Sequence, residues 1–309
     1  MSASKTLLLI DGNNLLHRAY HALPPLTDKT GENANAVFGF SNMLLRATKE
    51  VEPTYIACAF DTRAPTFRHV EFEAYKAQRK APPEDLYPQL PKVKGVLDAF
   101  GVKYFEKAGY EADDLLGTLS MQSLDKVDQV VILSGDRDVL QLVDGKIKVQ
   151  MPGWNLATTT LFGSKEVLEK YGVMPLQMID YKAMTGDPSD NIPGVAGIGP
   201  KTASSLLQKY KTLEGIYDHI DEISGTTREK LEKDKEVALA AKKLVELDTE
   251  VEIDFWLDEL KFKPDWEKVI KEFEGLGFKS IVAKLQGKAV QSAKSSNVSE
   301  KNKDQLELI

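Results

Sequence analysis

Aspartate residues follow three short apolar runs in the first half of this 309-residue chain. The run "LLLI" leads into Asp11, "IACAF" leads into Asp61, and "VVILS" leads into a glycine followed by Asp136 and Asp138. In an open α/β sheet the carboxyl ends of the strands form the functional edge, because the loops there line the crevice where strand order reverses. If these runs are strands, their carboxylates lie side by side.

Two further acidic groups occur later in the chain. The stretch "GYEADDLLG" places Glu111, Asp113 and Asp114 at the start of a helix, and "GDPSDN" contains Asp187 and Asp190. Each group alone has an ordinary explanation, because aspartate often occupies turns or helix N-caps and acidic side chains complement the helix macrodipole. Converging carboxylates, however, raise one another's pKa and destabilise the fold unless something cationic neutralises them.

Mg²⁺ or Mn²⁺ meets that requirement, because hard cations take carboxylate and water oxygens. Nine carboxylates are more than one ion needs. Two ions about 4 Å apart, which clamp the attacking and leaving oxygens of a phosphoryl displacement, would use such a cluster. The chemistry expected is therefore hydrolysis of phosphodiester bonds, with one metal lowering the pKa of a bound water and both stabilising the transition state.

A glycine-rich stretch, "IPGVAGIGPKTA", follows the last acidic group and is called the glycine turn here (residues 192–203). It has neither the Walker A nor the G-x-G-x-x-G spacing. Gly194, Gly197 and Gly199 instead indicate a tight turn between two helices, with a proline in the first turn of the second helix. Backbone amides there, with Lys201 and Thr202, would hold a DNA phosphate without reading sequence. A purely structural hairpin is the alternative, and the nearby aspartates favour function.

A basic and aromatic segment begins directly after Asp61. Such a segment suits single-stranded nucleic acid, whose phosphates and base faces both need partners, and it could form a mobile helical element over the site. A solvated amphipathic helix explains the segment equally well. Its basic residues are Arg63, Arg68, Lys76, Arg79 and Lys80, interleaved with Phe67, Phe72 and Tyr75.

The elements that must position these residues change in character along the chain. Strands are expected at "KTLLLI", "TYIACAF", "GVKYFE" and "DQVVILS", with helical patterns at residues 35–50 and 90–100 between them. This alternation predicts a mostly parallel sheet covered by helices. From about Ser164 the pattern becomes helix after helix, at residues 164–172, 176–186, 201–210, 228–247 and 265–277. The end of the chain, from residue 288, has no aromatics and is expected to be disordered.

Composition excludes several classes of protein. The chain has one cysteine, Cys58, and four scattered histidines, which leaves no disulfide framework and no zinc-type cluster. No apolar run is long enough to cross a bilayer, and the first one meets Asp11 too soon for a signal sequence, so a cytosolic protein is expected. The net charge of −7 argues weakly against nucleic acid, but setting the nine carboxylates aside leaves 38 acidic against 40 basic residues.

Five stretches, in their order and spacing, resemble the 5′ nuclease domain of bacterial DNA polymerase I and its stand-alone 5′–3′ exonuclease relatives in the flap endonuclease family. The resemblance runs from about Lys5 to about Leu285. It implies a PIN-like α/β core, a helical arch and a helix-three-turn-helix motif that holds duplex DNA. The stretches are "LLLIDGNNLLHRAYHAL", "CAFDTRAPTFRHVEFEAYKAQR", "GYEADDLLGTL", "ILSGDRDVLQLV" and "GDPSDNIPGVAGIGPKTASSLL".

The resemblance also implies roles for single residues. Asp11, Asp61, Glu111, Asp113 and Asp114 look like ligands of one metal, and Asp136, Asp138, Asp187 and Asp190 look like those of a second, some of them through water. Lys76 and Arg79 match arch residues that approach the scissile phosphate. The implied catalytic set is therefore Lys76, Arg79, Asp11, Asp61 and Asp136. Tyr75 would stack on a base. The backbone of Gly194, Val195, Gly197 and Ile198 lies where family members hold K⁺.

The expected protein is a Mg²⁺- or Mn²⁺-dependent 5′ nuclease that removes 5′ flaps and RNA primers from DNA during replication and repair. Its expected parts are a PIN-like core at residues 1–175 with an arch at about 63–87, a helical DNA-binding region at 176–287, and a tail at 288–309. A PIN-type ribonuclease and a non-catalytic module for branched DNA remain alternatives. The tail could lead to a polymerase domain. Its last residues, "QLELI", are similar to a sliding-clamp-binding peptide, although a polar tail with two leucines explains them more simply.

Overall fold

The computed structural model describes residues 4–153 and 158–287, and the predicted tail lies outside them. A six-stranded sheet has the order β3-β2-β1-β4-β5-β6, and all neighbouring strands are parallel except β5 and β6. The four predicted strands are confirmed. The strands are β1 (Thr6–Asp11), β2 (Tyr55–Phe60), β3 (Lys103–Glu106), β4 (Gln129–Leu133), β5 (Ile147–Pro152) and β6 (Thr159–Phe162).

The central strands are buried on both faces. Every residue of β1 and β2 is buried, as expected for parallel strands covered by helices on both sides. In the sheet β1 lies between β2 and β4, so the strand order reverses beside β1. Ile10 pairs with Leu133, and the loops that follow β1 and β4 therefore leave the sheet side by side. This crevice is where the sequence places Asp11 and Asp136.

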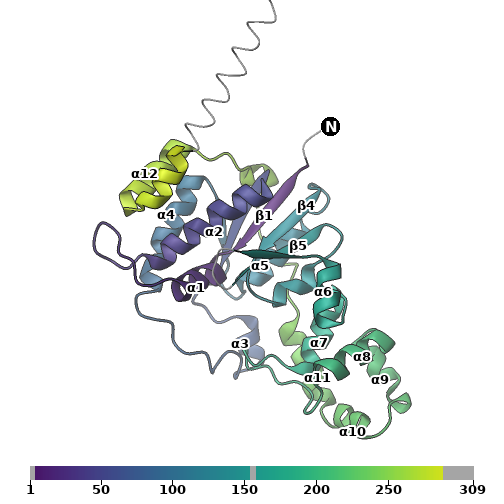
Figure 1. Ribbon diagram of the computed structural model, residues 1–309. Helices are drawn as coiled ribbons and strands as arrows, with labels where there is room; N and C mark the ends of the chain where they lie inside the picture. Colours follow the sequence, from purple (N-terminus) through teal and green to yellow (C-terminus); the bar gives the residue numbers. More distant parts are fainter. Residues whose placement is uncertain (1–3, 154–157, 288–309) are drawn as a thin grey trace, which may run out of the picture.

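Helices cover the two faces of the sheet. One face carries α1 (Gly12–Ala22), α2 (Asn35–Val51), α4 (Leu90–Phe100) and α12 (Trp266–Leu276), whose apolar residues pack with Leu8 and Ile10. The other face carries α5 (Ala112–Met121), which packs with Leu7 and Leu9. Helix α12, from late in the chain, packs on α4, as Figure 1 shows.

The second half of the chain is helical, and α8 to α11 form the end of the molecule farthest from α12 (Figure 1). The helix predicted at residues 228–247 is two helices, broken at Asp234, whose carboxylate accepts a hydrogen bond from the Ala196 amide of the glycine turn at 2.8 Å. The helices are α6 (Ser164–Tyr171), α7 (Met178–Thr185), α8 (Pro200–Tyr210), α9 (Leu213–Asp218), α10 (Thr226–Lys233) and α11 (Lys235–Val245). None of the helices in the described residues is long and apolar enough to span a membrane.

The segment from Arg63 to Tyr87, expected as a helical arch, contains one short helix, α3 (Phe67–Glu71). Thr66 caps this helix in a reciprocal hydrogen-bonded box with His69. Beyond it the chain forms turns fastened to the loop before the glycine turn: the Asn191 side-chain amide donates to the Ala74 carbonyl at 2.7 Å, and Gln78 donates to the Pro188 carbonyl. Two prolines, at positions 82 and 83, then prevent a longer helix.

Candidate active site

Asp11 ends β1 and caps α1. Its carboxylate accepts hydrogen bonds from the Asn14 amide at 2.9 Å and from the Ser134 hydroxyl at 2.6 Å, which ties the end of β1 to the end of β4. The side chain is only 4% exposed. Burial raises the pKa of Asp11 to about 7, although both hydrogen bonds oppose the shift.

Four more carboxylates join Asp11 around one cleft of about 820 Å³: Asp61, Glu111, Asp113 and Asp136. Asp61, which follows β2, accepts a hydrogen bond from the Ala112 amide at 2.7 Å and so joins β2 to the start of α5. Asp136 reaches the cleft from the loop after β4. The carboxyl ends of the central strands thus bring these residues together as the sequence predicts, and the group is called the acidic cleft here.

The electrostatics of the acidic cleft call for a cation. Loss of hydration raises the pKa of Asp61, Asp113 and Asp136, and neighbouring carboxylates raise the pKa of Asp113 further. The Oδ1 atom of Asp113 is buried and has no hydrogen-bond partner among the described residues. Carboxylate oxygens without a donor are the ligands that Mg²⁺ and Mn²⁺ prefer. The residues present therefore fit a hard divalent cation.

A second group, Asp138, Asp187 and Asp190, lies beside the cleft. One oxygen from each carboxylate lies within 4.8 Å of the others, which is close enough for all three to bind one ion. Lys182 of α7 pairs with two of them, at 2.7 Å from Asp187 and in direct contact with Asp138. Burial would raise the pKa of Asp187, but Lys182 and Ser189 hold it below its usual value.

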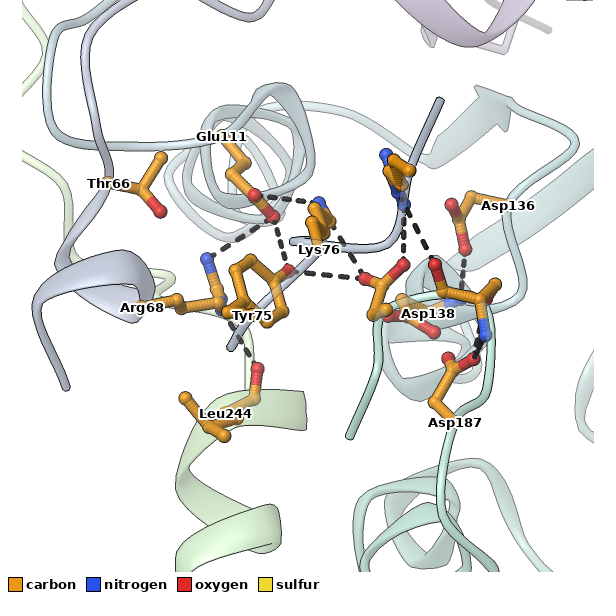
Figure 2. A network of polar contacts seen from close by, with 12 residues as sticks. Thr66, Arg68, Tyr75, Lys76, Glu111, Asp136, Asp138, Asp187 and Leu244 are labelled. Atoms are coloured by element: carbon orange, nitrogen blue, oxygen red, sulfur yellow. Dashed lines mark hydrogen bonds and ion pairs between the residues drawn. The ribbon is translucent and has the colours of Figure 1, made fainter. Parts of the chain in front are cut away.

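The two predicted arch cations contact carboxylates of both groups, and Figure 2 shows Lys76 beside Glu111. The Lys76 ammonium lies 2.7 Å from Glu111 and 3.6 Å from Asp190, and Arg79 pairs with Asp190. Burial alone would lower the pKa of Lys76, but the two carboxylates raise it above its usual value. Lys76 has a left-handed backbone (φ +54°), which is strained for a residue with a side chain. The arch segment is thus attached to the carboxylates through ion pairs of Lys76 and Arg79.

Two predicted roles are wrong for residues in the protein interior. Arg68, expected to bind DNA, is 1% exposed and forms two hydrogen bonds with Asp114, at 2.8 and 2.7 Å. Arg68 also donates to the carbonyls of Leu244 and Glu246 at the end of α11. Asp114, expected as a metal ligand, is fully buried and binds this guanidinium and the amides of Glu111 and Asp248. Together they join α3, α5 and the end of α11.

Tyr75, expected to stack on a base, is also buried, at 3% exposure. Its hydroxyl lies 3.1 Å from Glu111 and 3.2 Å from Asp190. The ring packs edge-on against His69. In this structure the ring has no free face for a base, and the hydroxyl links the two carboxylate groups.

The other predicted DNA-binding residues lie at the surface. Arg63 and Lys80 are exposed and line the clefts below the arch segment, and Lys201 is exposed at the start of α8. The part of the chain that the structure describes contains no ion pair to any of these three side chains. Thr202, beside Lys201, is partly exposed. These positions suit contacts with a polyanion.

The backbone of the glycine turn packs closely against the backbone at the end of α7. A Cβ on Gly194 would lie 2.2 Å from the Gly186 amide nitrogen, and Gly197 has a left-handed backbone (φ +75°). The side chains of Val195 and Ile198 point inward and are buried. Gly199 caps α8. The Gly197 carbonyl accepts a hydrogen bond from Lys230 of α10 at 3.1 Å, so one carbonyl of the turn already faces a cation.

Sequence reasoning missed Lys182 and Ser134. Lys182 belongs to a helix that ends directly before "GDPSD". The available signal for its ion pairs was its position, one turn from the end of a helix that leads into an acidic loop. Ser134 follows β4 directly and so lies at the same sheet edge as the aspartates. Both supply polar groups to carboxylates that the sequence had identified.

Two family models cover most of the chain. One described as "5′-3′ exonuclease, N-terminal resolvase-like domain" matches residues 6–172, and one described as "5′-3′ exonuclease, C-terminal SAM fold" matches residues 173–268. The chain belongs to the 5′–3′ exonuclease family. Enzymes of this family are nucleases that act on DNA phosphodiester bonds, and the predictions of family, fold class and enzyme class are confirmed.

Similar proteins include DNA polymerase I of Caldicellulosiruptor bescii, 42% identical over 90% of this chain, and DNA polymerase I of Bacillus subtilis, 37% identical over 98%. The chain spans 33% and 34% of these relatives, about a third of their length. Among solved structures, the flap endonuclease of bacteriophage T5 has a TM-score of 0.67 at 19% identity, over 94% of this chain and 100% of that one. This exonuclease-family member therefore shares the fold of the phage enzyme.

Proposed function

We propose that this 5′–3′ exonuclease-family chain is a structure-specific 5′ nuclease that hydrolyses phosphodiester bonds at 5′ ends and 5′ flaps of DNA and in RNA primers, with two Mg²⁺ or Mn²⁺ ions. The observation that carries the proposal is the acidic cleft, where Asp113 has a buried oxygen without a partner and the pKa of Asp11 is raised to about 7. Such a cluster is costly without bound cations.

In this proposal the chain's own residues divide into two ligand sets. Asp11, Asp61, Glu111, Asp113 and Asp136 would hold one ion at the cleft. Asp138, Asp187 and Asp190 would hold the other, with Asp136 between the two sets. When bound, the ions supply a nucleophilic hydroxide at neutral pH and stabilise charge on the phosphate oxygens.

Lys76 and Arg79 supply positive charge at the same place. Their ammonium and guanidinium groups already lie on Glu111 and Asp190, within reach of a phosphate that enters the cleft. Arg63 and Lys80 extend this charge below the arch segment, where a single strand would lie. The glycine turn would hold the duplex through its backbone and Lys201, and the carbonyls of Val195 and Ile198 are the proposed K⁺ ligands.

Partners follow from the relatives. The solved phage flap endonuclease is a pseudo-enzyme-product complex with DNA and metal ions. By analogy, branched DNA and RNA primer–DNA hybrids are the proposed substrates of this chain. Because the chain spans about a third of DNA polymerase I relatives, a following polymerase domain is also proposed. A sliding-clamp peptide at 305–309 lies outside the described residues.

The proposed location is the cytoplasm, at the nucleoid. Within the chain, residues 1–175 would form the nuclease core and residues 176–287 the DNA-holding region.

The experiment uses a 5′-labelled flap duplex, a blunt duplex and a matching RNA, each incubated with the protein in Mg²⁺, Mn²⁺ or EDTA. Metal-dependent release of the flap near its junction is expected, in preference to cleavage of the RNA. Asp136→Asn should abolish cleavage and retain DNA binding. Binding without cleavage in both metals would instead support a recognition module, and preferred cleavage of the RNA would support a ribonuclease.

A further inference from the structure

Each carboxylate of the second acidic group is paired with a cation of the chain itself. Asp190 pairs with Arg79 and, at 3.6 Å, with Lys76, and both cations come from the arch segment. Asp138 and Asp187 pair with Lys182, which comes from α7. The first two cations are already part of the proposed phosphate contacts. The proposed function gives Lys182 no role.

Lys182 occupies the position that a metal ion would need. Its ammonium lies between Asp138 and Asp187, and in the part of the chain described here it bonds no other group. The three side chains are 12%, 13% and 11% exposed, so little solvent separates the charges. A divalent ion bound by carboxylate oxygens that lie within 4.8 Å of one another would compete with this ammonium for Asp138 and Asp187.

We propose that Lys182 is an internal counter-cation of the second metal site, which the incoming divalent ion must displace from Asp138 and Asp187. The inference rests on the proposed function. It assigns to Lys182 two effects of opposite sign: the ammonium stabilises the metal-free carboxylates, and it weakens the metal affinity of the site by the same interaction. Linkage requires both effects, because a group that binds only the metal-free state competes with the metal.

A pocket beside Lys182 can accommodate the displaced ammonium. Lys182 lines a pocket of about 530 Å³ beside the second acidic group, together with Tyr171, Tyr181 and Ser189. The lysine side chain is a flexible four-carbon stem with one end fixed on α7. The Tyr171 hydroxyl is buried and has no hydrogen-bond partner among the described residues, so it is one acceptor available near the pocket.

The test compares Lys182→Met with Lys242→Met by titrating the purified protein with Mn²⁺, using calorimetry and the electron paramagnetic resonance signal of free Mn²⁺. Lys242 is a matched control, because it also bridges two carboxylates, Asp180 at 2.8 Å and Glu214 at 2.7 Å, away from the cleft. Lys182→Met should tighten the weaker Mn²⁺ site about tenfold, equal to about 1.4 kcal/mol. Lys242→Met should leave both Mn²⁺ affinities unchanged, and Lys182→Arg, which keeps the charge, should leave the weak site weak.

Thermal unfolding separates a competitor from a merely structural lysine. Without metal, Lys182→Met should have a lower Tm than the wild type, because two carboxylates lose their counter-ion. In saturating Mn²⁺ the two Tm values should coincide, because the lysine is no longer paired there. An unchanged or weaker Mn²⁺ affinity, or an equal loss of Tm with and without metal, would overturn the proposal. Failure of the wild type to bind Mn²⁺ at all would overturn the proposed function as well.

Discussion

Replacing Asp113 and Asp114 separately by asparagine should change the stability of the metal-free protein in opposite directions. The two residues are adjacent in α5, and the family resemblance assigned both to one metal. The structure gives them different surroundings, because Asp113 faces other carboxylates and Asp114 faces an arginine.

Asp114→Asn should be strongly destabilising. The carboxylate is fully buried, both of its oxygens bond Arg68, and it also accepts the backbone amides of Glu111 and Asp248 at 3.0 and 2.9 Å. The substitution would leave the Arg68 guanidinium buried without its counter-ion. Removing one partner of a buried ion pair costs about 3–5 kcal/mol, so we expect a loss of that size in the free energy of unfolding.

Asp113→Asn should have the reverse effect on stability. Burial and the carboxylates of Asp11, Asp136 and Asp61 raise the pKa of Asp113 well above its usual value, so its ionised form opposes folding at neutral pH. A neutral amide of the same shape removes that cost. The same change deletes a proposed metal ligand, so the Mn²⁺ affinity should fall while the metal-free stability rises.

Urea unfolding in EDTA and Mn²⁺ titration of each variant provide the assay. A double variant of Arg68→Met with Asp114→Asn should be less destabilised than the two single variants predict together, because each single variant leaves one buried charge unpaired and the double variant leaves neither. Equal destabilisation by Asp113→Asn and Asp114→Asn would refute the assignment. So would a selective loss of Mn²⁺ affinity in a stable Asp114→Asn protein.

Three other outcomes follow from the structure. Folding raises the pKa of Asp11 to about 7, so the protonated carboxyl stabilises the fold fully below about pH 4, and this contribution is lost as the pH rises to 7. Urea unfolding in EDTA should show the free energy of unfolding falling over this range, and Mn²⁺ should oppose the fall. Gly194→Ala would place a Cβ 2.2 Å from the Gly186 amide nitrogen and should lower the free energy of unfolding by about 1–3 kcal/mol or more, which thermal unfolding measures. An unchanged Tm would mean that the turn relaxes freely. Lys201→Ala should weaken DNA binding and lower the salt slope by about one, whereas an unchanged slope would assign the turn a structural role only.

The sheet could be predicted from sequence where strands are long, apolar and buried on both faces. Runs such as "TLLLID" and "YIACAF" have no other simple explanation. Strands β5 and β6 gave no such signal: the edge strand β6 is four residues long with two exposed residues, and β5 beside it contains lysine and glutamine among its apolar residues. The break at Asp234 was equally hidden, because it coincides with a contact to the Ala196 amide, 38 residues away.

The carboxylates could be predicted as a group because strand ends bring them to one edge, but their partners could not. A basic residue on an amphipathic helix has the same sequence pattern whether it faces water or a buried carboxylate. Arg68 and Asp114 are 46 residues apart, and Lys182 and Asp138 are 44 apart. Only the folded chain distinguishes a DNA contact from an internal ion pair, which is why Arg68 was misassigned.

Net charge is a poor guide to partners here for the same reason. Much of the acidic surplus of the chain lies in carboxylates at the site, and four of them pair with Lys76, Arg79 or Lys182 within a few ångströms. The exposed cations Arg63 and Lys80 belong to the arch segment instead and line the clefts beside it. A polyanion approaching from outside is screened from distant charges over about 8–10 Å at ordinary salt, so it responds to the nearest surface. The local field at the arch segment and the glycine turn, rather than the total of −7, therefore determines whether DNA binds.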